Sequence, residues 1–379
     1  MYSRRVVLGG GAAAVSLLVA PSLKAQSAPL SYEIPLKLDD RRLLLEARIN
    51  GQGPLSLVLD TGGQLSLIDE RLVDRLKLRP AGSMRLGIAG VPTAYKLYQA
   101  DEIIFGEQVR QPRPTFAATT HVNFRGENAG SLASGFLASI DSEIDFRALK
   151  LRLFPNGGPS RDGWHTHERT LRKAEVDGLS PYFLADATIG DVAFRPLLDT
   201  GAPSAIIAYP RLVTSLALYE GNWSPSFKRG ELIDKVVRSN RPFRMGSLTV
   251  ERPLVTLRTS DQFGVDALVG LPILQQIDMA TDVRANRLYT RPNGMPPTPP
   301  YYNMSGLWID RDGSAITAGA VGRGSPAEAA GIRVGDRLGG MEFRPMIDAL
   351  NAAPGSRVAI SVGKGSSQRA VELVLRDYL

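Results

Sequence analysis

The pattern of apolar and polar positions predicts a chain built mainly of short β-strands. Residues 31–38 alternate between polar and apolar side chains, which is the period of a half-buried strand. Residues 42–49 and 55–59 are further apolar-rich runs, separated by a Gly-Gln-Gly-Pro segment typical of a turn. Short runs with Gly and Pro between them recur along the chain, so we expect small closed β-barrels.

Two segments without apolar periodicity divide the chain. Residues 156–175 are polar and glycine-containing, and residues 292–300 hold five prolines, which predicts a stiff, extended spacer. Setting the N-terminus aside, the expected organisation is a first lobe at 30–155, a second lobe at 176–291 and a third unit at 301–379.

The N-terminus predicts export from the cytoplasm. Residues 1–25 place Arg4 and Arg5 before a small, apolar run, and this run is too short and too glycine-rich for a membrane span. The segment Ser-Arg-Arg-Val-Val-Leu resembles a bacterial twin-arginine export signal, with an ordinary secretion signal as the alternative. Either signal predicts a periplasmic or secreted protein without a membrane span, cleaved after Ala25 or Ala28.

Composition narrows the remaining classes. With 43% hydrophobic and 22% charged residues, a membrane channel, a fibre and a largely disordered chain are excluded. The chain has no cysteine, which excludes disulfides, thiolate metal sites and a cysteine nucleophile. Removing the three basic residues of segment 1–25 lowers the net charge from +7 to +4. No block of like charge follows, so we expect no nucleic-acid partner.

The chain has few histidines from which a metal site or a catalytic triad could be built. The three histidines are His121, His165 and His167, and the last two lie in the predicted linker, where we expect them to face solvent. The sequence contains no Gly-x-Ser-x-Gly and no Walker motif. We therefore predict no metal and no cofactor.

The two lobes share a pattern that predicts an internal duplication. An apolar strand runs into Asp60–Thr61–Gly62 and again into Asp199–Thr200–Gly201, at an offset of 139 residues. Ile-Asp pairs that begin at Ile140 and Ile277 follow at an offset of 137. A near-constant offset over about a hundred residues is typical of a repeated unit.

Paired Asp-Thr-Gly turns suggest acid–base chemistry. If the lobes pack about a twofold axis, Asp60 and Asp199 meet, share one proton and act as a catalytic pair. Thr61 and Thr200 can hydrogen-bond across the pair, while the glycines allow a close approach. A lone Asp-Thr-Gly is more often a capped turn with a solvated carboxylate, and the pairing of two such turns favours the catalytic interpretation.

These motifs resemble those of retropepsin-type aspartic proteases in a single-chain form, over about residues 30–291. The family supports each active-site turn with an apolar-apolar-Gly segment. The second copy matches at Leu268–Val269–Gly270, but the first has Ala133 in place of the glycine. The resemblance implies two β-barrel lobes, a polypeptide substrate and no cofactor.

The family covers its substrate with a glycine-tipped hairpin called the flap. Residues Gly87, Ile88, Ala89 and Gly90 are the candidate for its tip in the first copy, with an ordinary hairpin turn as the alternative. Residues 225–230 match weakly in the second copy, so we expect one flap.

Residues 301–379 resemble a bacterial PDZ domain, through the run Gly-Ser-Pro-Ala-Glu-Ala-Ala-Gly-Ile-Arg-Val-Gly-Asp that begins at Gly324. Ser325 should cap a short helix that starts at Pro326. The resemblance implies that Ser305, Gly306, Leu307 and Trp308 form a loop that binds the carboxylate of a peptide tail. The alternative is a PDZ fold that packs on the protease or binds an internal segment.

Two functions remain open from the sequence. The first is an exported, monomeric aspartic endopeptidase whose PDZ domain recruits or regulates. The second is a periplasmic peptide-binding or scaffold protein that keeps the protease fold without turnover, suggested by Ala133 and by the weak second flap. Because one chain supplies both aspartates, pairing of two chains is not required.

Overall fold

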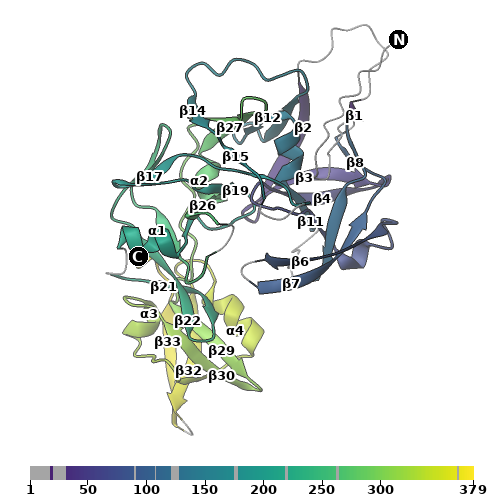
Figure 1. Cartoon of the computed structure of the whole chain (residues 1–379). Helices are drawn as coiled ribbons and strands as arrows, with labels where there is room; N and C mark the ends of the chain where they lie inside the picture. The colour runs from purple at the N-terminus through teal and green to yellow at the C-terminus, as the bar shows by residue number, and fades with distance from the viewer. Residues whose placement is uncertain are drawn as a thin grey trace, which may run out of the picture.

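The computed structural model of the chain describes residues 18–19, 31–88, 91–106, 108–120, 128–174, 178–217, 221–261, 264–364 and 367–379. These residues form a mainly β structure with few, short helices (Figure 1). The predicted signal segment lies outside them except for β1 (Leu18–Val19), which pairs with β9 (Val109–Pro112). Within the described part of the chain, no helix is both long and apolar enough to cross a bilayer.

The strands predicted near the N-terminus are present as β2 (Tyr32–Asp39), β3 (Arg42–Ile49) and β4 (Gln52–Asp60). Alternate residues of β2 are buried, among them Ile34 and Leu36, as the period-two pattern requires. Two 3-10 helices, Glu70–Leu72 and Ser134–Ser139, complete this lobe. Its other strands are β5 (Leu67–Asp69), β6 (Arg79–Ile88), β7 (Val91–Gln99), β8 (Glu102–Phe105), β10 (Thr115–Thr119), β11 (Asn128–Ala133), β12 (Asp141–Asp145) and β13 (Lys150–Phe154).

Among the described residues, the second lobe contains a six-stranded sheet, a four-stranded sheet, a two-stranded pair and the strands that join it to the first lobe. Its helices are α1 (Pro210–Leu216) and α2 (Leu271–Leu274). Its strands are β16 (Tyr182–Phe183), β17 (Ala187–Ile189), β18 (Val192–Phe194), β19 (Leu197–Asp199), β20 (Ile206–Ala208), β21 (Ser224–Arg229), β22 (Leu232–Arg238), β23 (Phe243–Met245), β24 (Leu248–Val250), β25 (Leu254–Leu257), β26 (Ala267–Gly270), β27 (Ile277–Asp282) and β28 (Arg287–Pro292).

The lobes are joined through β12 and β27, which pair antiparallel. In this pair Glu143 lies opposite Ala280, and these two residues are separated by 137 positions, the offset of the sequence repeat. Ser142 donates its N–H to the Thr281 hydroxyl across the same junction, at 2.9 Å. One hydrophobic core cluster contains buried residues of both lobes, so the two lobes pack as one body.

The expected closed barrels are not formed by the described strands. The largest sheet is open, with the order β14-β28-β27-β12-β13-β2-β3-β4-β11-β5-β10-β7-β6 along its main path. It stays open because β2 and β13 continue into the junction between the lobes instead of pairing back onto β6. The mainly β class is therefore confirmed, while the barrel geometry is wrong.

The segment predicted as a linker, residues 156–175, contributes strands of its own. β14 (His165–Glu168) pairs antiparallel with β28 and extends the sheet between the lobes, and β15 (Leu171–Arg172) pairs with β16. The expectation that both histidines face solvent is wrong for His167, which is fully buried. Its Nδ1 accepts the Asp186 N–H at 3.1 Å, and its Nε2 lies 3.0 Å from the Thr290 hydroxyl.

His167 should make the fold sensitive to acid. Burial, with the nearby His165, lowers the pKa of His167 to about 4 from an ordinary 6.5. Because the folded pKa lies below the unfolded one, the unfolded chain takes up the proton first as the pH falls. We expect this residue to remove about 2 kcal/mol of unfolding free energy between pH 7 and pH 4.5.

Urea unfolding of wild type and of His167→Gln at several pH values checks this expectation. Wild type should lose more stability than the variant on acidification, whatever the variant costs at neutral pH. Parallel pH dependences of the two proteins would mean that His167 titrates alike in the folded and unfolded states.

The C-terminal unit (residues 301–379) has its own five-stranded sheet and hydrophobic core, and lies against the second lobe (Figure 1). Ser325 accepts the Glu328 N–H at 3.1 Å and caps the helix that starts at Pro326, which confirms that prediction. The elements are β29 (Leu307–Asp312), β30 (Ala315–Val321), α3 (Pro326–Ala329), β31 (Arg337–Gly339), α4 (Phe343–Leu350), β32 (Arg357–Lys364) and β33 (Ser367–Val374).

The proline-rich segment before this unit packs on the second lobe. Asn293 donates its backbone N–H to the Gln276 carbonyl and its side-chain amide to the Gln275 carbonyl, both at 3.0 Å. Thr298 accepts a hydrogen bond from the Gln275 side chain. The sequence did not predict these anchoring bonds.

Candidate active site

The two Asp-Thr-Gly turns occupy equivalent positions at the ends of β4 and β19. Asp60 is the last residue of β4 and Asp199 the last of β19. The Asp60 carbonyl accepts the Gly63 N–H, and the Asp199 carbonyl accepts the Ala202 N–H, each at 3.2 Å. The apolar strands end in the same tight turn, and each turn carries one carboxyl side chain.

The threonines of the two turns bond each other reciprocally. The Thr61 N–H donates to the Thr200 hydroxyl at 3.1 Å, and the Thr200 N–H donates to the Thr61 hydroxyl at 3.0 Å. Each hydroxyl in turn donates to a carbonyl of the opposite strand, that of Leu198 or Leu59. Both threonines are buried, so these four bonds hold the turns together away from water, as the sequence predicts.

The two carboxyl groups are hydrogen-bonded to each other. The glycines make this approach possible. A Cβ atom at Gly62 would lie 2.3 Å from Cγ of Asp199, and one at Gly201 would lie 2.7 Å from Cγ of Asp60. Any side chain at either position would push the opposite aspartate away, which explains why both turns end in glycine.

Burial raises the pKa of both carboxyls, while hydrogen bonds from Asp199 and from the backbone of Gly62 and Gly63 partly offset the effect at Asp60. The charge of Asp60 and the hydrogen bond to it raise the pKa of Asp199 further, well above that of a free aspartate. The pair therefore retains one proton at pH values where an isolated aspartate is ionised. One ionised and one protonated carboxyl are a general base and a general acid in contact.

Each turn is supported by a parallel strand, and the two supports differ at one residue. Gly270 of β26 lies opposite Asp199, and Ala133 of β11 lies opposite Asp60. A Cβ at Gly270 would lie 2.0 Å from the Ser204 carbonyl oxygen. In the first lobe Ala133 is buried at this position, and its N–H donates to the Ser66 hydroxyl at 3.0 Å.

Ser66 is a supporting residue that the sequence did not single out. In the second lobe the corresponding donor, the Gly270 N–H, reaches the backbone carbonyl of Ala205 at 3.0 Å. Ser66 precedes Ala205 by 139 positions, the same offset as between Asp60 and Asp199. This offset could therefore have pointed to Ser66 as the residue equivalent to Ala205. The use of the Ser66 hydroxyl in place of a backbone carbonyl as the acceptor, however, depends on contacts between distant residues, which the local sequence does not show.

The candidate flap is the hairpin of β6 and β7, in which Gly87 pairs with Pro92 and Ile88 with Val91. Ala89 and Gly90, its predicted tip, lie outside the described residues. The second lobe also has a hairpin at the corresponding place, formed by β21 and β22 around Gly230. Phe227 of that hairpin packs edge-on against Trp308, with ring centroids 6.1 Å apart, so it contacts the C-terminal unit.

The predicted carboxylate-binding loop lies far along the chain, at the start of β29. The N–H groups of its first three residues already have partners in the loop or just before it. The side-chain oxygen of Asn303 accepts the N–H groups of Ser305 and Gly306, both at 3.1 Å, and the Ser305 hydroxyl accepts the Leu307 N–H at 3.2 Å. Asn303, which sequence reasoning missed, thus occupies two of the donors that a peptide carboxylate would need.

Among the described residues, no three His, Asp or Glu side chains lie close enough together to hold a metal ion. The acid–base groups present at this site are the two carboxyls.

Comparison with known proteins gives one family match and several structural likenesses. Residues 45–132, which include the first Asp-Thr-Gly turn, match the model of the Aspartyl protease family. No curated protein sequence matches the chain significantly.

Solved structures similar to this chain include the aspartic proteinase from Irpex lacteus, at 10% identity and a TM-score of 0.45, with 70% of this chain and 98% of that chain covered. The structure described as edgp has the same identity and TM-score, with 70% of this chain and 96% of that chain covered. At this TM-score we base no conclusion on either likeness.

Proposed function

We propose that the chain is an aspartic endopeptidase. The observation that carries the proposal is the Asp60–Asp199 pair, hydrogen-bonded to each other and clamped by the reciprocal bonds of Thr61 and Thr200. The family match over residues 45–132 supports a protease function in general. The ionised carboxylate removes a proton from a water molecule, which attacks the carbonyl carbon of a peptide bond.

In the same step the protonated partner hydrogen-bonds the carbonyl oxygen, where negative charge develops. The tetrahedral intermediate then collapses as a proton passes to the leaving nitrogen. Both carboxyls return to the shared-proton state without a covalent enzyme intermediate. The reciprocal threonine bonds keep the two groups in contact throughout, so little reorganisation is needed.

The remaining sequence predictions accompany this proposal. We propose that residues 1–25 direct export to the periplasm or outside the cell, by the twin-arginine-like signal. We also propose that the two lobes arose by duplication and that the C-terminal unit is a PDZ-type domain.

The scaffold alternative depended on Ala133 and on a weak second flap. Two observations speak against it: the Ala133 N–H is bonded to the Ser66 hydroxyl, and β21 and β22 form a hairpin in the second lobe.

The pH dependence of cleavage tests the proposed function. With an unfolded protein such as β-casein as substrate, kcat/KM should follow a bell-shaped curve over about pH 3 to 8. Activity should fall above the upper pKa of the pair, because the acid is lost, and below the lower one, because the base is lost. A chain that is folded but cleaves nothing at any pH would contradict the proposal.

Binding of pepstatin separates the protease from the scaffold alternative. An intact carboxyl pair should bind this transition-state mimic far more tightly than the Asp60→Asn variant does. Equal binding to both proteins would favour the scaffold.

A further inference from the structure

A cavity of about 270 Å³ lies between the second lobe and the proline-rich segment, and Arg41 reaches it from the turn between β2 and β3 of the first lobe. Its walls are mostly apolar and include the prolines of segment 297–300. Among the described residues that line it, the charged ones are Arg41, Arg238 and Arg252, and none is acidic. The lining therefore favours an anionic occupant.

The charge of Arg238 is already balanced. Its guanidinium donates to the Asp377 carboxylate at 2.9 Å, and to the carbonyl oxygens of Leu379 and Arg252 at 2.8 and 3.3 Å. All three of its nitrogens are thus engaged in hydrogen bonds. Arg238 is therefore part of the wall and holds the backbone of Arg252 in place beside the cavity.

Arg41 and Arg252 keep the donors of their side chains available. Neither guanidinium donates a hydrogen bond to any residue that the structure describes. The Asp40 carboxylate lies 3.8 Å from Arg41, which is too long for a hydrogen bond, and no described carboxylate pairs with Arg252. Two positive charges, one from each lobe, therefore border the same cavity.

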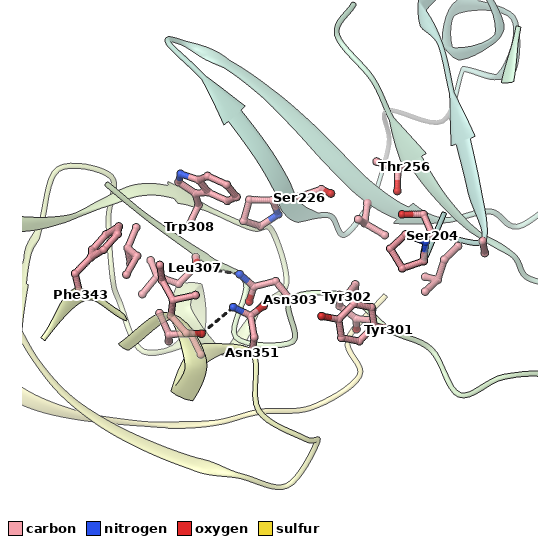
Figure 2. Close-up of a pocket in the computed structure, with 18 residues that line it drawn as sticks. Ser204, Ser226, Thr256, Tyr301, Tyr302, Asn303, Leu307, Trp308, Phe343 and Asn351 are labelled. Atoms are coloured by element: carbon pink, nitrogen blue, oxygen red, sulfur yellow. Dashed lines mark hydrogen bonds between the residues drawn. The ribbon is translucent and has the colours of Figure 1, made fainter. Parts of the chain in front are cut away.

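Tyr301 holds the Arg41 side chain at this cavity. The Cζ atom of Arg41 lies 3.3 Å from the centre of the Tyr301 ring, and both residues line the cavity. Stacking covers one face of the planar guanidinium, while its N–H groups point outward in its own plane and stay open to oxygen acceptors. Tyr301 also lines a neighbouring cavity of about 290 Å³, between the second lobe and the C-terminal unit, at the end opposite Phe343 (Figure 2).

The backbone at Arg41 also points to a role for its side chain. Asp40 and Arg41 form the two-residue turn between β2 and β3, with φ angles of 42° and 58°. A turn with two left-handed residues favours Asn-Gly, and a long side chain is unusual at its second position. Glycine would suit the turn better, so the arginine is explained by what its side chain contacts and not by the hairpin itself.

We propose that this cavity binds a phosphate-type oxyanion, held between the guanidinium groups of Arg41 and Arg252. A phosphate group carries a charge of about −1.5 to −2 at neutral pH, which matches two unpaired guanidiniums. Its oxygens accept the bidentate, charge-assisted hydrogen bonds that arginine forms. A single carboxylate carries one charge and would leave one arginine unbalanced, so it should bind less tightly.

The bound anion would link three parts of the chain. Arg41 belongs to the first lobe, Arg252 to the second, and Tyr301 to the start of the C-terminal unit. Binding should therefore stabilise the contact between the first lobe and the segment that leads into the C-terminal unit. The site uses neither carboxyl of the candidate active site, so this inference does not depend on the proposed protease function.

Isothermal titration calorimetry with inorganic phosphate tests the proposal on the chain from Gln26 onward, at about pH 7 and at constant ionic strength set with sodium chloride. Wild type should bind phosphate at one site, at least about tenfold more tightly than acetate. Arg41→Gly and Arg252→Gln should each weaken phosphate binding about tenfold. Arg41→Gly should fold normally, because glycine favours this turn.

Arg244→Gln is the matched control. Arg244 is exposed on β23 of the second lobe and lies outside the cavity. This variant removes the same charge from the surface and should bind phosphate as wild type does. General attraction of anions to a basic protein would weaken in all three variants alike.

Hydrogen exchange locates the bound anion. Phosphate should slow amide exchange at residues 40–42 and at Tyr301 in wild type, and should leave these positions unchanged in Arg41→Gly. Glycerol phosphate, titrated in parallel, separates two sources of the ligand. Binding of both compounds indicates that the phosphate group can belong to a larger molecule, and binding of inorganic phosphate alone indicates the free anion. Either result upholds the site.

Three results would overturn the proposal. Phosphate that binds no better than chloride at equal ionic strength would show that the cavity has no oxyanion site. Unchanged binding in both Arg41→Gly and Arg252→Gln would place the anion elsewhere. An equal loss in Arg244→Gln would show that net charge, and not the cavity, is responsible. None of these measurements uses cleavage, so their failure leaves the protease proposal unaffected.

Discussion

The single substitutions Asp60→Asn and Asp199→Asn should each lower the rate of peptide cleavage by about two to four orders of magnitude. Each substitution leaves one carboxyl of the pair, which cannot serve as base and acid in the same step. Because the groups share one proton and one hydrogen bond, the two single variants should be about equally impaired. Initial rates on β-casein at the wild-type pH optimum measure the loss.

The same variants should be more stable than wild type at neutral pH. A carboxyl whose folded pKa is raised binds its proton more tightly in the folded state, so its contribution to stability is lost as the pH rises through that pKa. Asn removes the charge that the folded protein must otherwise bury. The matched control is Asp191→Asn, on an exposed turn of the second lobe, which should change neither cleavage nor melting temperature. A melting temperature lowered by the pair substitutions at pH 7 would contradict this electrostatic interpretation.

Gly270→Ala should destabilise the second lobe by more than about 3 kcal/mol, at the upper end of the cost of overpacking. The added methyl group would meet the Ser204 carbonyl oxygen at 2.0 Å and the Ala202 carbonyl oxygen at 2.7 Å. Both are backbone atoms and cannot rotate away, so the turn that carries Asp199 must shift. Urea unfolding measures the stability, and cleavage assays should show a lower kcat because the carboxyl pair is displaced.

The first lobe supplies the matched comparison. Ala133 holds the position that corresponds to Gly270, and its methyl group is already accommodated beside Ser66. Ala133→Gly should therefore cost no more than about 1 kcal/mol, the entropic cost of glycine in a strand. Similar losses in Gly270→Ala and Ala133→Gly would show that the two supports do not differ as described.

The parts of the structure that could be predicted are those that depend on neighbouring residues or on the repeated Asp-Thr-Gly motif. The bounds of β3 match the apolar run, and the repeated turns bring Asp60 and Asp199 together with their threonines bonded across. The helix cap at Ser325 could likewise be predicted from the sequence, because capping depends on neighbouring residues alone.

What could not be predicted depends on contacts between distant segments. β14 is short and polar, and only its pairing with β28 reveals that His167 points inward. The side chain of Asn303 accepts a hydrogen bond from the loop before β29. The sequence motif alone does not distinguish this loop from one whose N–H groups are free. The docking of the second lobe on the C-terminal unit likewise depends on Gly322 and Gly324, because a Cβ at either position would lie 2.3 Å from an atom of the second-lobe loop.

The most direct test of the central claim is to incubate a proteome-derived peptide library with the chain from Gln26 onward, which lacks the proposed signal, over about pH 4 to 8. Asp60→Asn, Asp199→Asn and Asp191→Asn are treated in parallel, and new termini are read by mass spectrometry. The account predicts internal cleavages with wild type and Asp191→Asn, and none above background with either variant of the pair. Cleavage that persists in Asp60→Asn or Asp199→Asn would contradict a shared carboxyl pair as the catalytic centre.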